Sequence, residues 1–257
     1  MLQPATRPRI SEVVITGGSC AGKTEAMPKL ASALRTRGIR TITVPEIATM
    51  IIQGAHPDIS EIARQDQYDF CRFQREVFLV HRLLRERARV YASGFDEDQV
   101  VILYDRGEMD GIAYHRHHCF EALAAEAGTT MAQIRDSYTA VIHMVTTANG
   151  AEDFYTNFNN SARWDNAEEA REFDRRVLAV WLEHPRHVVV DNTTDWQGKL
   201  NRLTDATLAA IGLDQQLQID VSVTTGDPTP EEMELELAAE DNTIPLRGVR
   251  ATDRVSA

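Results

Sequence analysis

Residues 17–24 have the composition and spacing of a loop that holds nucleotide phosphates. They read GGSCAGKT and match the pattern GxxxxGKT/S. The loop follows a short β-branched run and precedes a run with helical spacing, which is the context that such a loop requires. The residues predicted to contact the nucleotide here are Gly17, Gly18, Ser19, Cys20, Ala21, Gly22, Lys23 and Thr24.

Lys23 and Thr24 are expected to act through their side chains. The ammonium group of Lys23 would contact the β- and γ-phosphates, and the hydroxyl of Thr24 would bind Mg²⁺. Cys20 is either a redox-sensitive thiol near a helix N-terminus or simply a small residue that fits the loop. The loop predicts a Mg-nucleotide ligand and leaves ATP and GTP as alternatives, although no guanine-reading NKxD motif is present.

Asp105 and Arg106 follow an apolar run that reads as a buried strand, VVILY. The carboxyl end of a strand is the ligand-binding edge of a parallel sheet, so Asp105 would join Thr24 in binding Mg²⁺ or meet a reacting hydroxyl. Arg106 would then lie beside the transferred phosphate. The alternative is that Asp105 caps the next helix and Arg106 forms a surface ion pair.

Glu46 lies just beyond another short strand, TITV, and its carboxylate is the candidate contact with a phosphate acceptor. It would accept the acceptor's proton or hold its hydroxyl groups. The alternative is an ordinary loop charge.

An arginine-rich segment between residues 159 and 176 suggests a mobile cover over the site. A lid arginine would neutralise charge on the transferred phosphoryl group and exclude water. Arg163, in the irregular part, is the best candidate for this catalytic role. The alternative for its helical neighbours is ion pairing with Glu168 and Glu172. A further apolar run ends at residues 191–193, and the polar side chains there would touch the nucleotide base or cap the next helix: Asp191, Asn192 and Thr193.

Strands alternate with helices along the first 225 residues, which predicts an α/β fold with a parallel sheet covered on both faces. The five strands are expected at about 11–16, 40–48, 99–107, 139–147 and 187–194. Helices are expected at about 23–37, 60–92 (one long helix or two), 108–127, 166–184 and 195–211.

The composition excludes some partners. The chain of 257 residues is 43% hydrophobic, 26% charged and carries a net charge of −12, so we expect no nucleic-acid partner, since phosphate neutralisation needs a basic surface. No apolar run approaches the length of a membrane span. Three scattered cysteines favour a reducing, cytoplasmic setting. Residues 226–257 form an acidic tail, expected to be either solvated and partly disordered or a contact for a protein partner.

Five segments together resemble a known family: VVITGGSCAGKT, TVPEIATMII, VVILYDRGEMDGIAYH, AVIHMVTTANGAEDFY and ARWDNAEEAREFDRR. They look like the P-loop domain, of the AAA ATPase type, shared by bacterial nicotinamide-riboside kinases and TRPL translocation defect proteins. The architecture is similar to that of thymidylate and deoxynucleoside kinases. The resemblance covers about residues 10–212 and implies a P-loop NTPase with a five-stranded parallel sheet that binds a Mg-nucleotide.

Within that resemblance, Gly17, Gly22, Lys23 and Thr24 fit the phosphate loop. Asp105 and Arg106 fit the Asp-Arg pair of the kinases, and Glu46 fits the acceptor-side carboxylate. The prediction is therefore a kinase that moves the γ-phosphoryl group to a small hydroxylated or phosphorylated metabolite. The alternative is an ATPase or GTPase-type switch that acts on a protein partner.

Overall fold

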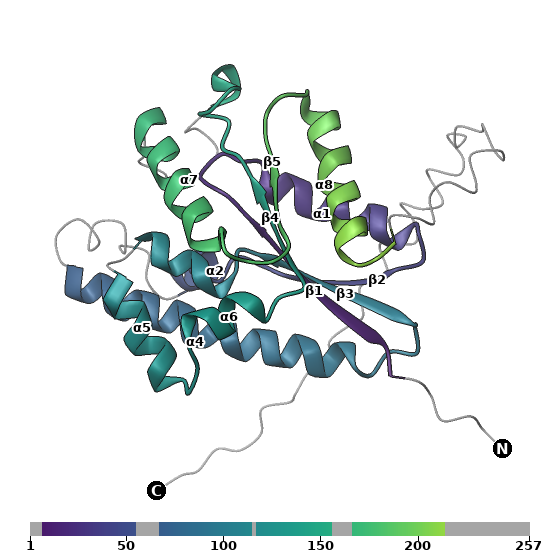
Figure 1. The fold of residues 1–257 in the computed structure, drawn as a ribbon, viewed down its shortest axis with the longest axis horizontal. Helices are drawn as coiled ribbons and strands as arrows, with labels where there is room; N and C mark the ends of the chain where they lie inside the picture. The colour runs from purple at the N-terminus through teal and green to yellow at the C-terminus, as the bar shows by residue number, and fades with distance from the viewer. Residues whose placement is uncertain (1–6, 55–66, 115–116, 156–165, 214–257) are drawn as a thin grey trace, which may run out of the picture. The chain divides into compact units, whose positions relative to one another are not determined.

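The computed structural model describes residues 7–54, 67–114, 117–155 and 166–213 of the chain (Figure 1). Within these ranges, five strands form one parallel sheet in the order β2-β3-β1-β4-β5, which confirms the predicted sheet. The strands are β1 (Arg9–Thr16), β2 (Arg40–Val44), β3 (Gln99–Asp105), β4 (Ala140–Met144) and β5 (His187–Val190).

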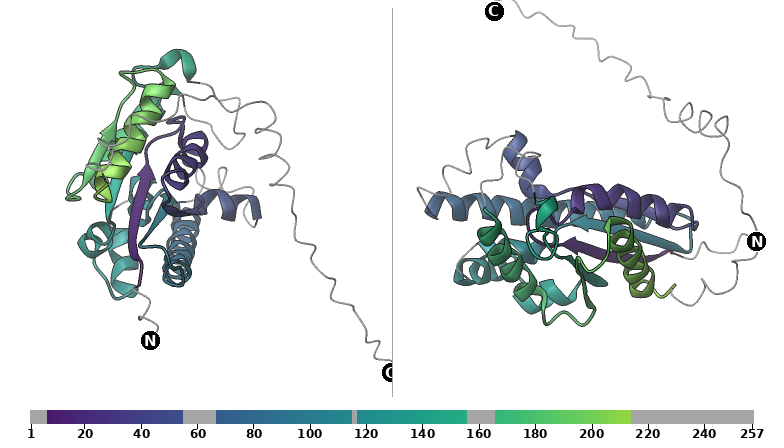
Figure 2. Two further views of the ribbon diagram at one scale, coloured as in Figure 1. Left: turned by 90° about the vertical axis from the view of Figure 1, so that its right-hand side faces the viewer. Right: turned by 90° about the horizontal axis from the view of Figure 1, so that it is seen from above.

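Helices connect the strands and cover both faces of the sheet (Figures 1 and 2). The α-helices are α1 (Lys23–Arg35), α2 (Ile47–Gly54), α4 (Gln67–Ala92), α5 (His117–Glu126), α6 (Met131–Asp136), α7 (Ala167–Trp181) and α8 (Trp196–Ala210). Two short 3₁₀ helices are η1 (Glu108–Tyr114) and η2 (Glu152–Phe154).

The alternation of side chains along β1 divides the core into two layers. Val13 and Ile15 pack with apolar residues of α1 and α8 on one face. Val14 packs on the opposite face with residues of α4, η1, α5 and α6, and with Trp181 at the end of α7. All four of these side chains are fully buried. This two-sided burial explains why the central strands β3 and β4 are apolar almost throughout.

The register of the sheet brings the carboxyl ends of three strands together. Ile15 of β1 lies opposite Asp105 of β3, and Val44 of β2 lies opposite Tyr104. Pro45 follows β2 directly, and the chain leaves the sheet there. The loops after β1, β2 and β3 therefore meet at one edge of the sheet, where ligands bind in folds of this kind.

Two predictions differ from the structure. The strand expected at 40–48 ends at Val44, and α2 begins at Ile47. The sequence suggests a helix over 108–127, whereas the structure has η1 followed by α5. Asp110 holds η1 against the sheet, because its carboxylate accepts hydrogen bonds from Thr16 Oγ1 at 2.9 Å and Trp181 Nε1 at 2.5 Å. Over the described ranges, no helix combines the length and the apolar character needed to cross a membrane. The predicted tail, 226–257, lies outside the described residues, so the division at residue 225 stays a prediction.

Candidate active site

The loop of residues 17–24 joins the end of β1 to the start of α1. Its backbone is left-handed at Gly17, Cys20 and Gly22, with φ angles of 138°, 56° and 86°. Gly17 admits no side chain, since a Cβ atom there would lie 2.0 Å from the carbonyl oxygen of Met144. Left-handed residues that alternate with right-handed ones direct successive N–H groups to one concave side, which binds anions. The loop therefore has the backbone geometry of a phosphate cradle.

Lys23 is buried within this loop, at 8% exposure. Its Nζ donates hydrogen bonds to the carbonyl oxygens of Gly17 at 2.9 Å and Gly18 at 2.8 Å. Burial, together with the nearby charge of Arg106, lowers the pKa of Lys23 to about 8. Its positive charge is thus weakly solvated and lies where a polyphosphate would offer anionic oxygens in place of carbonyl dipoles.

Glu46 and Arg106 form an ion pair at the mouth of the loop. Arg106 Nε donates to Glu46 Oε1 at 2.6 Å, and Arg106 Nη1 donates to Gly17 O at 2.9 Å. Burial would raise the pKa of Glu46, but the charges of Arg106 and Lys23 outweigh it and lower the pKa to about 2. Glu46 is therefore an ionised acceptor of hydrogen bonds near neutral pH. Residues that the sequence separates by 60 positions are in direct contact here.

Asp105 places an unsatisfied oxygen in the same site. Its Oδ1 is buried and receives no hydrogen bond from the described residues. Burial raises the pKa of Asp105, Lys23 opposes this rise, and the neighbouring carboxylate of Glu46 adds to it. A buried carboxylate oxygen without a donor matches the oxygen ligands that Mg²⁺ takes. The hydroxyl-bearing Thr24 lines the same cleft, so Asp105 and Thr24 fit a magnesium site.

These groups line a cleft of about 1360 Å³. The phosphate loop forms one wall, and Glu46 and Arg106 lie beyond it. The side nearest α4 and η1 is aromatic, formed by Phe73, Phe78, Tyr114 and Phe120. The side nearest α8 is formed by Asn192, Thr194, Asp195 and Trp196. The cleft thus extends from the phosphate loop toward both α4 and α8, as a site for two ligands requires.

The three predicted base-binding residues have different positions. Asn192 lines the cleft, and its amide is held by Thr146 O, Asn149 O and Lys199 Nζ. Asp191 and Thr193 are not among the residues that line the cleft. Asp191 Oδ1 instead accepts hydrogen bonds from the Thr193 hydroxyl and from Arg202, each at 2.6 Å. The N-cap of α8 is Asp195, whose side chain accepts a hydrogen bond from Gly198 N–H.

The arginine-rich segment is described only from residue 166 onward, so Arg163 lies outside the described residues. Arg175 and Arg176 pair with Glu172 on the surface of α7. Arg171 Nη1 donates to the carbonyl oxygen of Ala148 at 2.8 Å. For these helical arginines the structure thus shows surface ion pairs and a backbone contact.

Two aspartates that the sequence did not single out complete the site. Asp110 receives hydrogen bonds from Thr16 and Trp181, and lies 3.7 Å from Arg106 Nη1. Asp174 of α7 accepts a hydrogen bond from Gly18 N–H at 2.6 Å and contacts His143 at 3.1 Å. Burial opposes ionisation of Asp174, but the hydrogen bond and charge of His143 lower its pKa. α7 is therefore tied directly to the phosphate loop.

Comparison with known proteins places these features in a family. A model of the AAA domain matches residues 12–199, which span most of the chain. The chain belongs to the AAA domain family. Comparison with curated proteins returned no match.

Among solved structures, this AAA domain is similar to a deoxyadenosine kinase from M. mycoides with bound dATP, with a TM-score of 0.52. The two chains are 12% identical, and the match covers 77% of this chain and 98% of the kinase. At this identity the likeness establishes a shared fold. The family model and this likeness together show an AAA domain with the fold of a nucleoside kinase. The finer resemblance to nicotinamide-riboside kinases and TRPL proteins stays a prediction.

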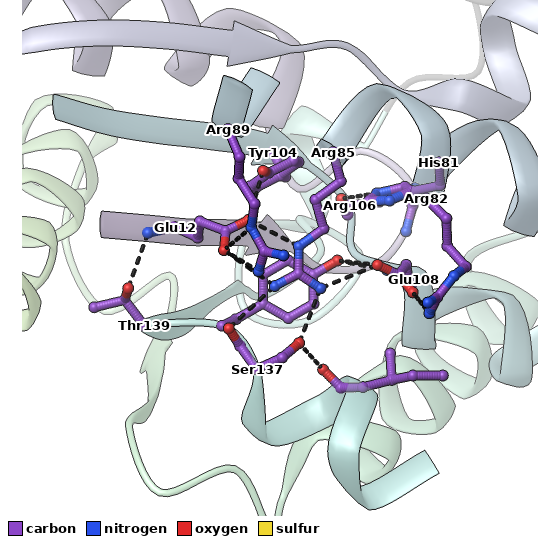
Figure 3. Close-up of polar contacts among 12 residues, drawn as sticks. Glu12, His81, Arg82, Arg85, Arg89, Tyr104, Arg106, Glu108, Ser137 and Thr139 are labelled. Atoms are coloured by element: carbon purple, nitrogen blue, oxygen red, sulfur yellow. Dashed lines mark hydrogen bonds and ion pairs between the residues drawn. The ribbon is translucent and has the colours of Figure 1, made fainter. Parts of the chain in front are cut away.

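Side chains of helix α4 of the AAA domain hold Arg106 and its surroundings in place (Figure 3). Arg106 is left-handed, with φ 71°, and its carbonyl oxygen lies 3.2 Å from His81 Nε2. One turn further along α4, Arg85 contacts Glu108 at 3.0 Å and Glu12 at 2.8 Å. Burial opposes the ionisation of Glu12, yet its hydrogen bond to Arg85 and the charge of Arg85 lower its pKa. This buried network fixes α4 to β1 and to η1, the element that follows Arg106.

Proposed function

We propose that this protein is a kinase that transfers the γ-phosphoryl group of a Mg-nucleotide, ATP or GTP, to a small hydroxylated or phosphorylated metabolite. The observation that carries the proposal is the ion pair of Glu46 and Arg106 on the wall of a cleft that continues beyond the phosphate loop. Hydrolysis alone needs only a water molecule at the loop. A carboxylate that faces a roomy cleft suits a second substrate.

The phosphate side of the site would act mainly through charge. Lys23 and the N–H groups of the loop would hold the phosphates, and Arg106 would stabilise charge on the transferred group. Thr24 and Asp105 would hold Mg²⁺, which would neutralise phosphate oxygens when bound. Arg163 would supply a further positive charge from the lid.

The acceptor side would act mainly through orientation. Phosphoryl transfer has a loose transition state, so the acceptor hydroxyl needs placement more than a strong base. Glu46, with a pKa of about 2, suits a group that accepts a hydrogen bond from that hydroxyl. The aromatic wall favours an acceptor with a ring or another apolar portion. Nucleosides head the panel of candidates because a deoxyadenosine kinase shares the fold.

A nucleotide switch is the second candidate, and the contact between Asp174 and Gly18 favours it. This contact would let α7 respond to the occupancy of the loop. The acidic tail, 226–257, would then contact the protein partner. In either case the scattered cysteines lead us to place the protein in the cytoplasm.

The deciding experiment uses ATP and GTP labelled at the γ-phosphate, with a panel of nucleosides, nucleotides and other hydroxylated metabolites. A kinase would move label into one acceptor class, and the Lys23→Ala variant would lose both transfer and nucleotide binding. Label found only as free phosphate across the panel would refute the kinase and support the switch. Unchanged nucleotide affinity in Lys23→Ala would refute the assignment of the loop.

A further inference from the structure

Three consecutive carbonyl groups of the phosphate loop, those of residues 19–21, are held from outside the loop. The donors are the hydroxyl of Thr146 to Ser19 O at 2.5 Å, the N–H of Thr147 to Cys20 O at 3.3 Å, and Nζ of Lys199 to Ala21 O at 3.2 Å. Thr146 and Thr147 follow β4, and Lys199 lies in the first turns of α8. Two elements that are remote in sequence thus contact the loop from one side.

The geometry of the peptide bond converts this contact into an orientation of the N–H groups. The described residues contain no cis peptide bond, and in a trans peptide the C=O and N–H groups point in opposite directions. Carbonyls held toward β4 and α8 therefore direct the N–H groups of residues 20–22 away from them, into the concave side of the loop. The left-handed backbone at Cys20 and Gly22 is consistent with this arrangement.

The buried position of the charged Lys199 side chain is unfavourable for folding. It is only 3% exposed, and among the described residues it forms no ion pair with a carboxylate. Its ammonium group instead donates hydrogen bonds to three oxygen atoms, which are Ala21 O, Val145 O at 2.8 Å and Asn192 Oδ1 at 2.6 Å. Burial lowers the pKa of Lys199 to about 8. The charges of Asp174 and Asp191 favour the ammonium form but do not outweigh burial, so this charge opposes folding, and we infer that it has a functional reason.

We propose that Thr146 and Lys199 are positioning residues for phosphate binding, which hold the loop carbonyls outward so that the N–H groups of residues 20–22 face the phosphates. This inference rests on the proposed nucleotide binding. It concerns a residue of the segment after β4 and a residue of α8, each of which would act on the phosphates through the loop carbonyl that it holds. Thr146 is the sharper test of the two, because valine reproduces its shape and lacks only the hydroxyl.

The test measures dissociation constants for ATP and for inorganic tripolyphosphate, which shares only the phosphates with ATP. Thr146→Val should weaken the binding of both by about tenfold, the equivalent of one hydrogen bond, and Thr146→Ser should restore it. The matched control is Thr207→Val. Thr207 is also fully buried and donates to a carbonyl, Leu203 O at 2.8 Å, but it lies inside α8 away from the loop. The Thr207→Val variant should be less stable than the wild type but should bind ATP and tripolyphosphate with unchanged affinity.

Lys199→Met extends the test to the second residue. It should weaken the binding of both ligands at least as much as Thr146→Val does. Thermal unfolding of each variant shows whether it is folded under the conditions of the binding assay. Affinities of Thr146→Val within twofold of the wild type would overturn the inference and leave the proposed function standing. Failure of the wild-type protein to bind ATP, GTP or tripolyphosphate would overturn both. A loss for ATP without a loss for tripolyphosphate would also overturn the inference, because the base and not the phosphates would then be affected.

Discussion

Replacing Lys23 by methionine should make the protein more stable while it removes nucleotide binding. The side chain of Lys23 is almost fully buried, and among the described residues its ammonium group donates hydrogen bonds to the carbonyl oxygens of Gly17 and Gly18. The positive charge of Arg106 lies nearby and opposes a second cation. Without a polyphosphate, the charge of Lys23 is therefore an unfavourable feature of the folded state. Methionine keeps an unbranched side chain of similar length and removes the charge.

The size of the effect follows from the pKa of Lys23. It falls from an ordinary value of 10.5 to about 8 in the folded protein, which at about 1.4 kcal/mol per pKa unit corresponds to about 3 kcal/mol of destabilisation at pH 7. The variant also loses two hydrogen bonds. Gly17 O keeps a donor in Arg106 Nη1, so mainly Gly18 O is left without one, at a cost of about 1 kcal/mol. We expect a net gain of about 2 kcal/mol.

The assay is urea unfolding of both proteins without nucleotide, from pH 7 to pH 9.5. Below pH 8 the folded wild-type protein carries the full penalty. As pH rises through 8, folded Lys23 loses its proton while the unfolded chain keeps it, so the wild type gains stability and the difference between the proteins shrinks. Lys199 titrates in both proteins, so its contribution cancels in the difference. A variant less stable than the wild type at pH 7, or a difference that does not change with pH, would refute the reasoning.

Three further substitutions test individual roles. Glu46→Gln should lower the rate of labelled-phosphate transfer by about 10²-fold or more with little change in nucleotide affinity, and equal losses in both would argue against an acceptor role. Asp105→Asn should raise the Mg²⁺ concentration for half-maximal turnover by about tenfold, and an unchanged magnesium dependence would exclude Asp105 as a ligand. Arg163→Ala should lower turnover by about 10³-fold, as expected for an arginine finger, while the nucleotide dissociation constant stays near that of the wild type.

The sheet, and the residues that meet at the carboxyl ends of its strands, could be predicted from the sequence. Short apolar or β-branched runs predicted the strands, and the carboxyl ends of parallel strands must share an edge. That rule is enough to predict that Asp105 and Glu46 approach the loop at residues 17–24. In the structure Glu46 reaches the loop through Arg106, which donates to Glu46 Oε1 at 2.6 Å and to Gly17 O at 2.9 Å.

The residues that support the site from α4 and α7 could not be predicted from the sequence. His81 and Arg85 lie within a long helix, and Asp174 lies in a helix rich in charges, where polar residues are ordinary. Which of them face inward depends on how α4 and α7 rotate against the sheet, and that rotation is set by packing between distant segments. Asp174 and Gly18 are 156 positions apart in the chain. One signal was available for Lys199, since lysine is scarce in this arginine-rich chain.

Arg106 connects the supporting residues of α4 to the candidate active site through its backbone, which has a left-handed conformation. A left-handed conformation is unfavourable for any residue with a side chain, and it persists only where the surroundings impose it. Here the N–H of Arg106 donates to Ile15 O at 3.0 Å, its carbonyl is held by His81, and its guanidinium is held by Glu46. Glycine would relieve the strain but would lose the guanidinium group. The strained arginine therefore indicates that the charge at this position matters more to the protein than the stability it costs.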